Sequence, residues 1–341
     1  MTSNTESTSS EDGSTTDTDD TDPSDEYETT TAPGERAVQM TDEDGTHVLD
    51  IDDLAPDEIA SVLDRAATVK AGEEEGRLAD RTLALLFEQP STRTRVSFEA
   101  GMSALGGTAT FLGPGETHLE RGEPVRDVAR ALSRYVDAIA ARVERHETLV
   151  ELATYADVPV INALSDRAHP CQTLADLLTI RESVGPLDSV TAAWVGDGNN
   201  VGASFALGCA ITGVDLTVAT PAAHGLSENV LDRADALGGA PTVTNDPEAA
   251  IEGADVVYTD VWVSMSDDAD RDEKLADFDG FQLNESLLSA APDAAVLHCM
   301  PAHRGEEIAE DVLEGDRELI WDQTENRMHV QNALLLELLN G

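Results

Sequence analysis

The sequence predicts an α/β fold with two doubly wound lobes of parallel sheet, joined by crossing helices. From about Val38 onward, short runs with high β propensity alternate with amphipathic helical patterns, and a parallel sheet requires this alternation. The chain has 341 residues, enough for about two domains of ~150 residues with a sizeable core. Two lobes therefore fit both the pattern and the length.

The first predicted unit is a strand followed by a loop and a helix. Residues 82–87 form the strand, and Phe98, Met102 and Leu105 then share one helical face, which Gly106-Gly107 ends. The other predicted strands span residues 108–112, 138–143, 158–163, 190–195, 216–220, 256–261 and 296–300.

Two apolar helices are predicted to connect the lobes. Residues 174–184 cross from the first lobe to the second, and residues 328–339 form a helix that packs back on the first. The predicted divisions are an acidic tail over 1–36, a first lobe over 37–170, a second over 171–326 and the C-terminal helix over 327–341.

Acidic residues dominate the composition. There are 68 acids against 21 bases, a net charge of −47, and only Lys70 and Lys274 are lysine. Residues 1–36 hold 11 acids and one base, with too little apolar surface to offset their ordering entropy, so they are expected to be disordered. The remainder keeps 57 acids against 20 bases, so we expect no nucleic-acid partner, which would require basic patches.

Cysteine content and hydropathy indicate the compartment. Cys171, Cys209 and Cys299 are too few and too scattered for a disulfide framework or a zinc ribbon. The N-terminus lacks a basic start and apolar stretch, and no later run reaches the ~18 apolar residues of a membrane span. We expect a soluble cytoplasmic protein that does not bind membranes.

The segment Ser91-Thr92-Arg93-Thr94-Arg95 follows the first predicted strand. Ser91 can cap the next helix, whose free first-turn amides point to the same place as the hydroxyls and one or both guanidinium groups. A capped helix with exposed arginines is the alternative. Arginines at a helix N-terminus oppose its dipole, however, so the segment favours a bound anion, most simply a phosphate.

His169-Pro170-Cys171-Gln172 directly precedes a helix predicted to begin at Thr173. The proline favours an extended backbone at His169, whose ring can donate to a substrate oxygen, while Gln172 offers an amide to a second polar atom. A packed structural histidine explains the tetrapeptide equally well. Only its combination with the arginine segment favours a binding role.

Residues 194–202 combine a strand end, a polar turn and a helix start. After Gly196 and Gly198, Val201 stands where a dinucleotide-binding fingerprint has its third glycine, so no nicotinamide cofactor is predicted. Asn199 and Asn200 can bind an amine and a carboxylate, or they can be ordinary turn residues.

Two further strands end in polar residues. Asp260 lies at one end, where its carboxylate can hold a substrate ammonium group, and residues 298–305 follow the other. Ligands of doubly wound sheets bind outside the carboxyl ends of strands, so we expect these residues, Asp197 and the asparagines to converge on one crevice. Cys299 and its neighbouring histidines match no usual zinc spacing, which favours a neutral polar donor.

These motifs together resemble the ornithine carbamoyltransferase family. The resemblance rests on Ser91-Thr92-Arg93-Thr94-Arg95, His169-Pro170-Cys171-Gln172, Asp260-Val261-Trp262-Val263-Ser264-Met265 and His298-Cys299-Met300-Pro301-Ala302-His303-Arg304-Gly305, in that order. The ending Trp321-Asp322-Gln323-Thr324-Glu325-Asn326-Arg327-Met328-His329 is similar too. The resemblance covers about residue 46 to the C-terminus and leaves only the acidic tail outside.

The resemblance implies transfer of a carbamoyl group from carbamoyl phosphate to the side-chain amine of ornithine, giving citrulline and phosphate. It implies catalytic roles for Arg142, His169 and Cys299. The implied carbamoyl-phosphate contacts are Ser91, Thr92, Arg93, Thr94, His118, Arg142, His169, Pro170, Cys171, Gln172, Cys299, Met300 and Arg327. The implied ornithine contacts are Asn200, Asp260, Ser264 and Met265.

No covalent nucleophile is needed for this transfer, and we expect neither a metal nor an organic cofactor. The resemblance also implies a homotrimer, or a larger assembly of trimers, in which the loop around residue 118 completes a neighbour's site. Two departures are His118, where the family usually has glutamine, and Ser266, where it has glycine. Histidine can still donate, although its protonation depends more on pH.

An acceptor other than ornithine is the nearest rival. Aspartate would need cationic groups for its second carboxylate, whereas Asp260 and Ser264 indicate a basic amine as the acceptor. Putrescine, which lacks only the α-carboxylate of ornithine, stays open as an alternative acceptor. A non-enzymatic protein that binds acidic metabolites would keep Arg93 but would have no reason to keep His169 and Cys299.

The scarcity of lysine and the charge of −47 predict adaptation to a high-salt cytoplasm, where a Debye length near ~3 Å removes most long-range repulsion of an anionic substrate.

Overall fold

The computed structural model describes residues 47–74, 76–263 and 271–340. The predicted acidic tail and the predicted ornithine contacts Ser264 and Met265 lie outside these residues, as does Ser266. Two parallel sheets flanked by helices confirm the predicted α/β class.

The first sheet has four parallel strands in the order β2-β1-β3-β4. Phe87, the last residue of β1, pairs with Arg142, the last residue of β3, so the loops that follow both strands leave from one edge. The strands are β1 (Thr82–Phe87), β2 (Thr108–Leu112), β3 (Ala138–Arg142) and β4 (Val160–Leu164). The helices of this half are α1 (Pro56–Lys70), α2 (Thr92–Ala104), α3 (Val125–Leu132) and α4 (His146–Tyr155), with short 3₁₀ turns η1 (Ile51–Asp53) and η2 (Leu119–Arg121).

The second sheet has five parallel strands in the order β7-β6-β5-β8-β9. Thr259, the last residue of β8, pairs with His298, the last residue of β9. The strands are β5 (Thr191–Val195), β6 (Asp215–Ala219), β7 (Thr242–Thr244), β8 (Val256–Thr259) and β9 (Ala295–His298). The helices are α6 (Asn200–Thr212), α7 (Glu228–Leu237), α8 (Pro247–Ile251), α9 (Arg271–Asp277), α10 (Glu285–Leu288) and α11 (Glu310–Leu313), with a 3₁₀ turn η3 (Leu187–Ser189).

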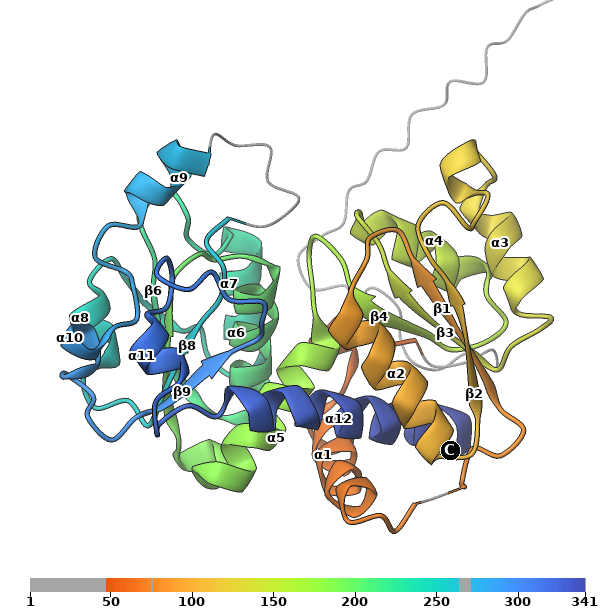
Figure 1. The fold of residues 1–341 in the computed structure, drawn as a ribbon, viewed down its shortest axis with the longest axis horizontal. Coiled ribbons are helices and arrows are strands. Elements are labelled where there is room, and N and C mark those ends of the chain that lie inside the picture. Colours follow the sequence, from red (N-terminus) through yellow and green to blue (C-terminus); the bar gives the residue numbers. More distant parts are fainter. Residues whose placement is uncertain (1–46, 75, 264–270, 341) are drawn as a thin grey trace, which may run out of the picture. The chain divides into compact units, whose positions relative to one another are not determined.

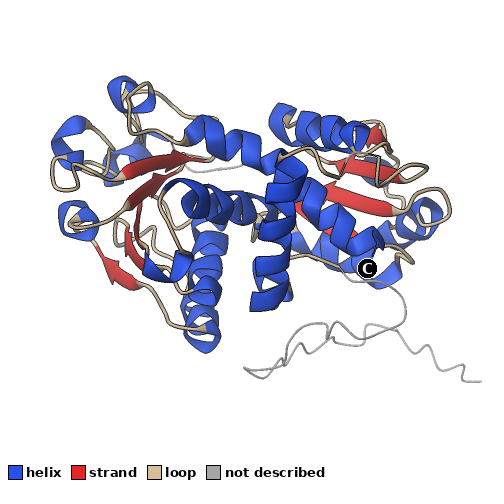
Figure 2. Ribbon diagram, turned by 90° about the horizontal axis from the view of Figure 1, so that it is seen from below, coloured by secondary structure: helices blue, strands red, loops and turns tan. Residues whose placement is uncertain are grey.

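Two helices, α5 (Pro170–Ser183) and α12 (Ile320–Asn340), run between the sheets (Figure 1). Figure 2 shows helices lying between the two groups of strands. Every residue of α5 from Pro170 to Ile180 is buried, as expected of a helix enclosed on all sides. α12 contacts α1, α2 and α5. It approaches α2 closely at Gly101, where an added Cβ would lie 2.1 Å from Asn332 Oδ1. One hydrophobic cluster includes Leu85 of β1, Leu177 of α5 and Trp194 of β5 and so spans both sheets.

Some predicted element ends differ from the structure. Strands β8 and β9 end two residues earlier than predicted, because Asp260 and Cys299 leave the ladder and bond to each other. Helix α5 begins at Pro170, not near residue 174, since proline suits the first turn, where no intrahelical donor is needed. Helix α12 begins eight residues before the predicted 328, and the short, mostly exposed strand β7 was not predicted. Among the described residues, no helix is both long and apolar enough to span a membrane.

Candidate active site

Several of the predicted site segments lie at the switch points of the two sheets, between β1 and β3 and between β5 and β8. Strand β1 is flanked by β2 on one side and β3 on the other, and β5 is flanked in the same way by β6 and β8. Connections leave in opposite directions at such points, which opens a crevice beyond the carboxyl ends of the strands. The loops after β1 and β3 carry the predicted anion site, and those after β5, β8 and β9 carry the predicted amine site.

The start of α2 is organised by Ser91. Its hydroxyl accepts from the Thr94 backbone N–H at 3.4 Å, which confirms the predicted N-cap, and lies 3.1 Å from Thr94 Oγ1. Thr94 is buried and accepts a hydrogen bond from Arg327 Nη2 at 3.3 Å. Arg95 instead pairs with Glu99 at 3.0 Å, so Arg93 is the arginine of this segment left for the anion site.

Three guanidinium groups gather around this helix start. Burial, together with the charges of Arg327 and Arg93, lowers the pKa of Arg142 to about 10. Burial also lowers the pKa of Arg327. Like charges brought together out of water are unfavourable unless an anion neutralises them. In the part of the chain that the structure describes, Arg142 Nε and Arg327 Nε are buried without a hydrogen-bond partner.

His169 adds a neutral donor to the same cluster. Its ring is buried, and burial together with Arg327 and Arg142 holds its pKa well below the ordinary 6.5. The imidazole is therefore uncharged at neutral pH. Its backbone N–H donates to Ser204 Oγ at 2.8 Å, whereas its Nδ1 finds no hydrogen-bond partner among the described residues.

Gln172 is held in one orientation by its neighbours. Its Oε1 accepts from Arg327 Nη1 at 2.5 Å, and its Nε2 donates to Asp176 Oδ1 at 2.7 Å. Asp176 Oδ1 also accepts from Gln323 Nε2 at 2.6 Å, so this buried carboxyl joins α5 to α12. Burial raises the pKa of Asp176 from 3.8 to about 7.

Asp176 was missed from the sequence although a signal for it was present. It stands four residues after Gln172 and seven after His169, which places all three on one helical face. Pro170 provides the first turn of that helix. The Cys171 thiol packs in the core, where it donates to the Asn162 carbonyl at 3.6 Å and burial raises its pKa to about 11. Any contact of Cys171 with a ligand therefore belongs to its backbone.

The second switch point carries asparagine and aspartate. Asn199 caps α6, accepting from the backbone N–H groups of Val201 and Gly202, and its Nδ2 donates to Asp260 Oδ2 at 2.8 Å. Asn200 Nδ2 donates to the Ser165 carbonyl at 2.7 Å, a contact that reaches the segment after β4. Both side chains therefore have structural bonds.

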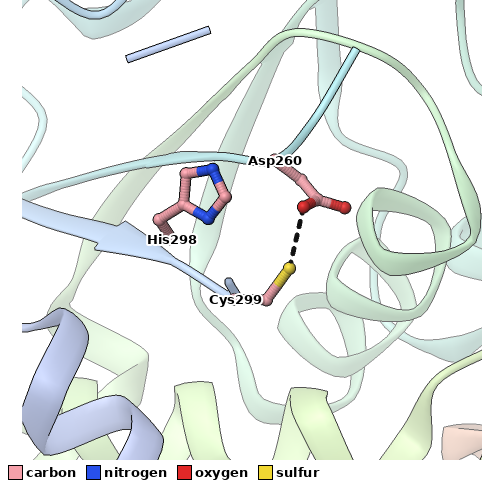
Figure 3. A group of neighbouring side chains, drawn as sticks. All are labelled: Asp260, His298 and Cys299. Atoms are coloured by element: carbon pink, nitrogen blue, oxygen red, sulfur yellow. Dashed lines mark hydrogen bonds between the residues drawn. The ribbon is translucent and has the colours of Figure 1, made fainter. Parts of the chain in front are cut away.

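Cys299 lies between the two groups. Its thiol donates to Asp260 Oδ1 at 2.9 Å, as Figure 3 shows, and burial together with Asp260 raises its pKa well above the ordinary value. The thiol is therefore protonated at neutral pH. Cys299 also lies within electrostatic range of Arg142 and Arg327, so the structure brings the end of β9 to the arginine cluster.

Asp260, His298 and Cys299 offer metal-ligand atoms within 4.8 Å of one another. These atoms already have protein partners. His298 Nδ1 accepts from the Met300 backbone N–H at 2.9 Å, and its Nε2 lies 3.0 Å from Glu307 Oε1. The atoms of the trio that could bind a metal are thus already engaged in hydrogen bonds within the protein.

Two predicted residues lie apart from this group. His118 is exposed before η2, where its Nδ1 lies 3.7 Å from Glu123 Oε2, so within this chain it does not join the arginine cluster. Asp197 after β5 forms an ion pair with Lys274 at 2.8 Å.

The fold and site define a two-lobed α/β protein in which a neutral histidine and a thiol lie between an arginine cluster and a carboxylate. A family model described as the carbamoyl-P binding domain of aspartate/ornithine carbamoyltransferase matches residues 46–182, and the Asp/Orn binding domain of the same family matches residues 188–338. The chain belongs to the aspartate/ornithine carbamoyltransferase family.

Individual relatives agree with the family models. An ornithine carbamoyltransferase of Haloquadratum walsbyi is 57% identical over 295 residues, which cover 86% of this chain and 98% of the relative. A catabolic ornithine carbamoyltransferase of Halobacterium salinarum is 49% identical over 297 residues, covering 86% and 99%. The solved ornithine carbamoyltransferase from Pyrococcus furiosus is 44% identical with a TM-score of 0.83, covering 87% of this chain and 98% of that one.

Proposed function

We propose that this protein transfers the carbamoyl group of carbamoyl phosphate to the side-chain amine of L-ornithine, giving L-citrulline and phosphate. One observation carries the proposal. Arg93, Arg142 and Arg327 gather beside a neutral His169, and buried nitrogens of Arg142, Arg327 and His169 lack partners among the described residues. Such a set of donors calls for a ligand with a doubly charged anionic end and a polar carbonyl.

Carbamoyl phosphate supplies both features. Its phosphate fits the first turn of α2, where Ser91, Thr92, Arg93 and Thr94 present hydroxyls, amides and a guanidinium group. Its carbamoyl oxygen would take donors from Thr94, Arg142 and His169. The second lone pair of Gln172 Oε1 is left to accept from the carbamoyl amide.

Attack by the neutral amine builds negative charge on the carbamoyl oxygen before phosphate leaves. Fixed donors in a water-poor site stabilise that charge more than they stabilise the ground state. Because His169 is uncharged, it donates one hydrogen bond without transferring a proton. The amine proton can leave with the phosphate, so positioning supplies most of the rate.

Ornithine would bind on the side of the second sheet. Asp260 offers a carboxylate to its α-ammonium group, and Asn200 offers an amide to its carboxylate. We assign Ser264 and Met265 to the same subsite by family resemblance. The protonated Cys299 thiol and the Met300 backbone would lie beside the reacting carbon.

The test is direct. The protein is incubated with carbamoyl phosphate and either ornithine, putrescine or aspartate, and each carbamoylated product is measured. We expect citrulline as the main product. Turnover of putrescine without turnover of ornithine would replace this assignment with the alternative acceptor, a simple diamine.

We further propose a homotrimer in which His118 reaches the phosphate of a neighbouring subunit. The exposure of its side chain, 67%, leaves it available for such a contact. Sedimentation measures the assembly, and a protein that stays monomeric while fully active would refute the shared site. We also propose that the lobes divide at residues 170 and 326.

A further inference from the structure

The turn that carries Cys299 and Met300 rests on a buried pair, His298 and Glu307. Both side chains are fully buried, and His298 Nε2 lies 3.0 Å from Glu307 Oε1. His298 ends strand β9, and Glu307 lies beyond the turn, just before α11. Neither residue touches a substrate in the function proposed above, so their pairing needs its own explanation.

The hydrogen bonds assign the tautomer of His298. The Met300 backbone N–H donates to Nδ1 at 2.9 Å, and because a backbone N–H is always a donor, Nδ1 must be an unprotonated acceptor. The ring proton then sits on Nε2, where it donates to the Glu307 carboxylate. Glu307 thus selects the tautomer that leaves Nδ1 available to Met300.

Met300 needs this support. Its φ is +57°, in the left-handed region that residues other than glycine seldom adopt. The hydrogen bond that its amide donates to the His298 ring ties Met300 to the end of strand β9. Loss of that acceptor would release the backbone between Cys299 and Pro301.

Glu307 also ties the far side of the turn. Its Oε1 accepts from the His303 backbone N–H at 2.6 Å as well as from His298, so one oxygen holds both ends of the turn. The adjacent Glu306 differs, because both of its oxygens are bound by Arg271. The grouping of His303, Glu306 and Glu307, although close enough to suggest a metal, therefore has one carboxylate already paired.

We propose that Glu307 is a positioning residue. It fixes His298 in the Nε2-protonated tautomer, which holds the Met300 amide and thereby places the turn of Cys299 and Met300 for carbamoyl transfer. This inference rests on the proposed function, in which that turn borders the reacting carbon.

Three variants test it by kinetics. Glu307→Ala should lower kcat about ten- to a hundredfold, the usual cost of losing an orienting partner, with both KM values nearly unchanged. Glu307→Gln keeps an acceptor oxygen and should restore most of kcat. Glu306→Ala, next in sequence but bound to Arg271, is the matched control and should leave kcat unchanged. Normal kcat in Glu307→Ala, or a Gln variant as slow as the Ala variant, would overturn the inference.

The tautomer can be read without substrates. In protein labelled with ¹⁵N-histidine, the signals absent from His298→Gln identify His298, and we expect the Nε2-protonated pattern in the wild type and in Glu307→Gln. A wild-type Nδ1-protonated pattern overturns the inference even if Glu307→Ala does not fold. Because this measurement needs no turnover, it separates the two proposals: an inactive wild type refutes the function and leaves the tautomer result standing.

Discussion

The two halves of the site occupy equivalent places in the two sheets but differ in how their polar groups are satisfied. Around the start of α2, Arg142, Arg327 and His169 keep buried nitrogens that have no partner among the described residues. Beyond β5 and β8, both oxygens of Asp260 already accept hydrogen bonds, from Asn199 and Cys299. The arginine half therefore keeps donors without acceptors, whereas both oxygens of the aspartate half are already hydrogen-bonded.

This difference assigns different work to the two ligands. On the arginine side an anion removes repulsion and gives orphaned donors their acceptors, so binding also stabilises the fold. On the aspartate side a cation must compete with the hydrogen bonds that Asp260 already accepts. The free energy gained on binding is therefore only the difference between a charged contact and a neutral one. The first half therefore depends on its ligand for stability, and the second does not.

Removing a guanidinium group should have the largest effect. Arg142→Met is expected to lower kcat/KM about 10²–10³-fold, because one donor to the developing oxyanion is lost. Its melting temperature without phosphate should equal or exceed that of the wild type, since the variant no longer buries a repelled charge. Kinetics and thermal unfolding, with and without phosphate, measure both effects.

The matched control for this variant is Arg81→Met, at the opposite end of the same sheet. Arg81 precedes β1 and pairs with Asp137 at 2.6 Å, so its loss should change neither turnover nor the stabilisation by phosphate. A marked drop in the melting temperature of Arg142→Met would contradict the repelled-charge account.

Asp260→Asn tests the other half. The amide keeps its size and one acceptor but loses the charge, so KM for ornithine should rise about ten- to a hundredfold, the equivalent of a charged hydrogen bond of about 1.5–3 kcal/mol. Stabilisation by phosphate should be unchanged. Asp255→Asn, at the other end of β8, is the control, since among the bonds identified the Asp255 carboxylate accepts only from the Thr191 backbone N–H. A change in phosphate binding instead of KM would show that the halves are not independent.

Local features of the molecule could be predicted from its sequence, whereas contacts between distant segments could not. Strands such as β1 and β5 follow from short apolar runs between helical patterns, and Ser91 follows from local capping rules. The partners of Asp176 do not, because Gln323 lies 147 residues further along the chain and only the packing of α12 on α5 brings them together. Glu307 was missed for a similar reason, since its role depends on a turn whose backbone geometry at Met300 no local pattern encodes.

Asp176→Asn should show a pH-dependent change in stability. Burial raises the pKa of Asp176 from 3.8 to about 7, so the folded protein holds a proton that the unfolded chain releases. Wild-type stability therefore falls as pH rises from about 4 to about 7, by at most about 4 kcal/mol, and this contribution is constant above that range.

Asparagine does not ionise, so the stability of the variant relative to that of the wild type should increase over the same pH range. Melting temperatures measured from about pH 5 to pH 8 in constant salt give the difference. Asp157→Asn, at an exposed position paired with Arg134, should show no comparable trend. A difference between wild type and Asp176→Asn that stays constant with pH would mean that the carboxyl is ionised throughout.

The smallest effect on activity is expected from salt, although its effect on stability should be clear. Self-repulsion from a net charge of −47 destabilises the compact state, and at molar KCl a Debye length near ~3 Å screens it, so the melting temperature should rise with KCl. Within the arginine cluster, Arg142 is partly buried and Arg327 is buried, where screening is weaker, so KM for carbamoyl phosphate should change by less than about threefold. Maximal stability and activity at low KCl would refute the adaptation of this surface to high salt. A KM that followed the melting temperature would instead show that the site is governed by the acidic surface and not by its own arginines.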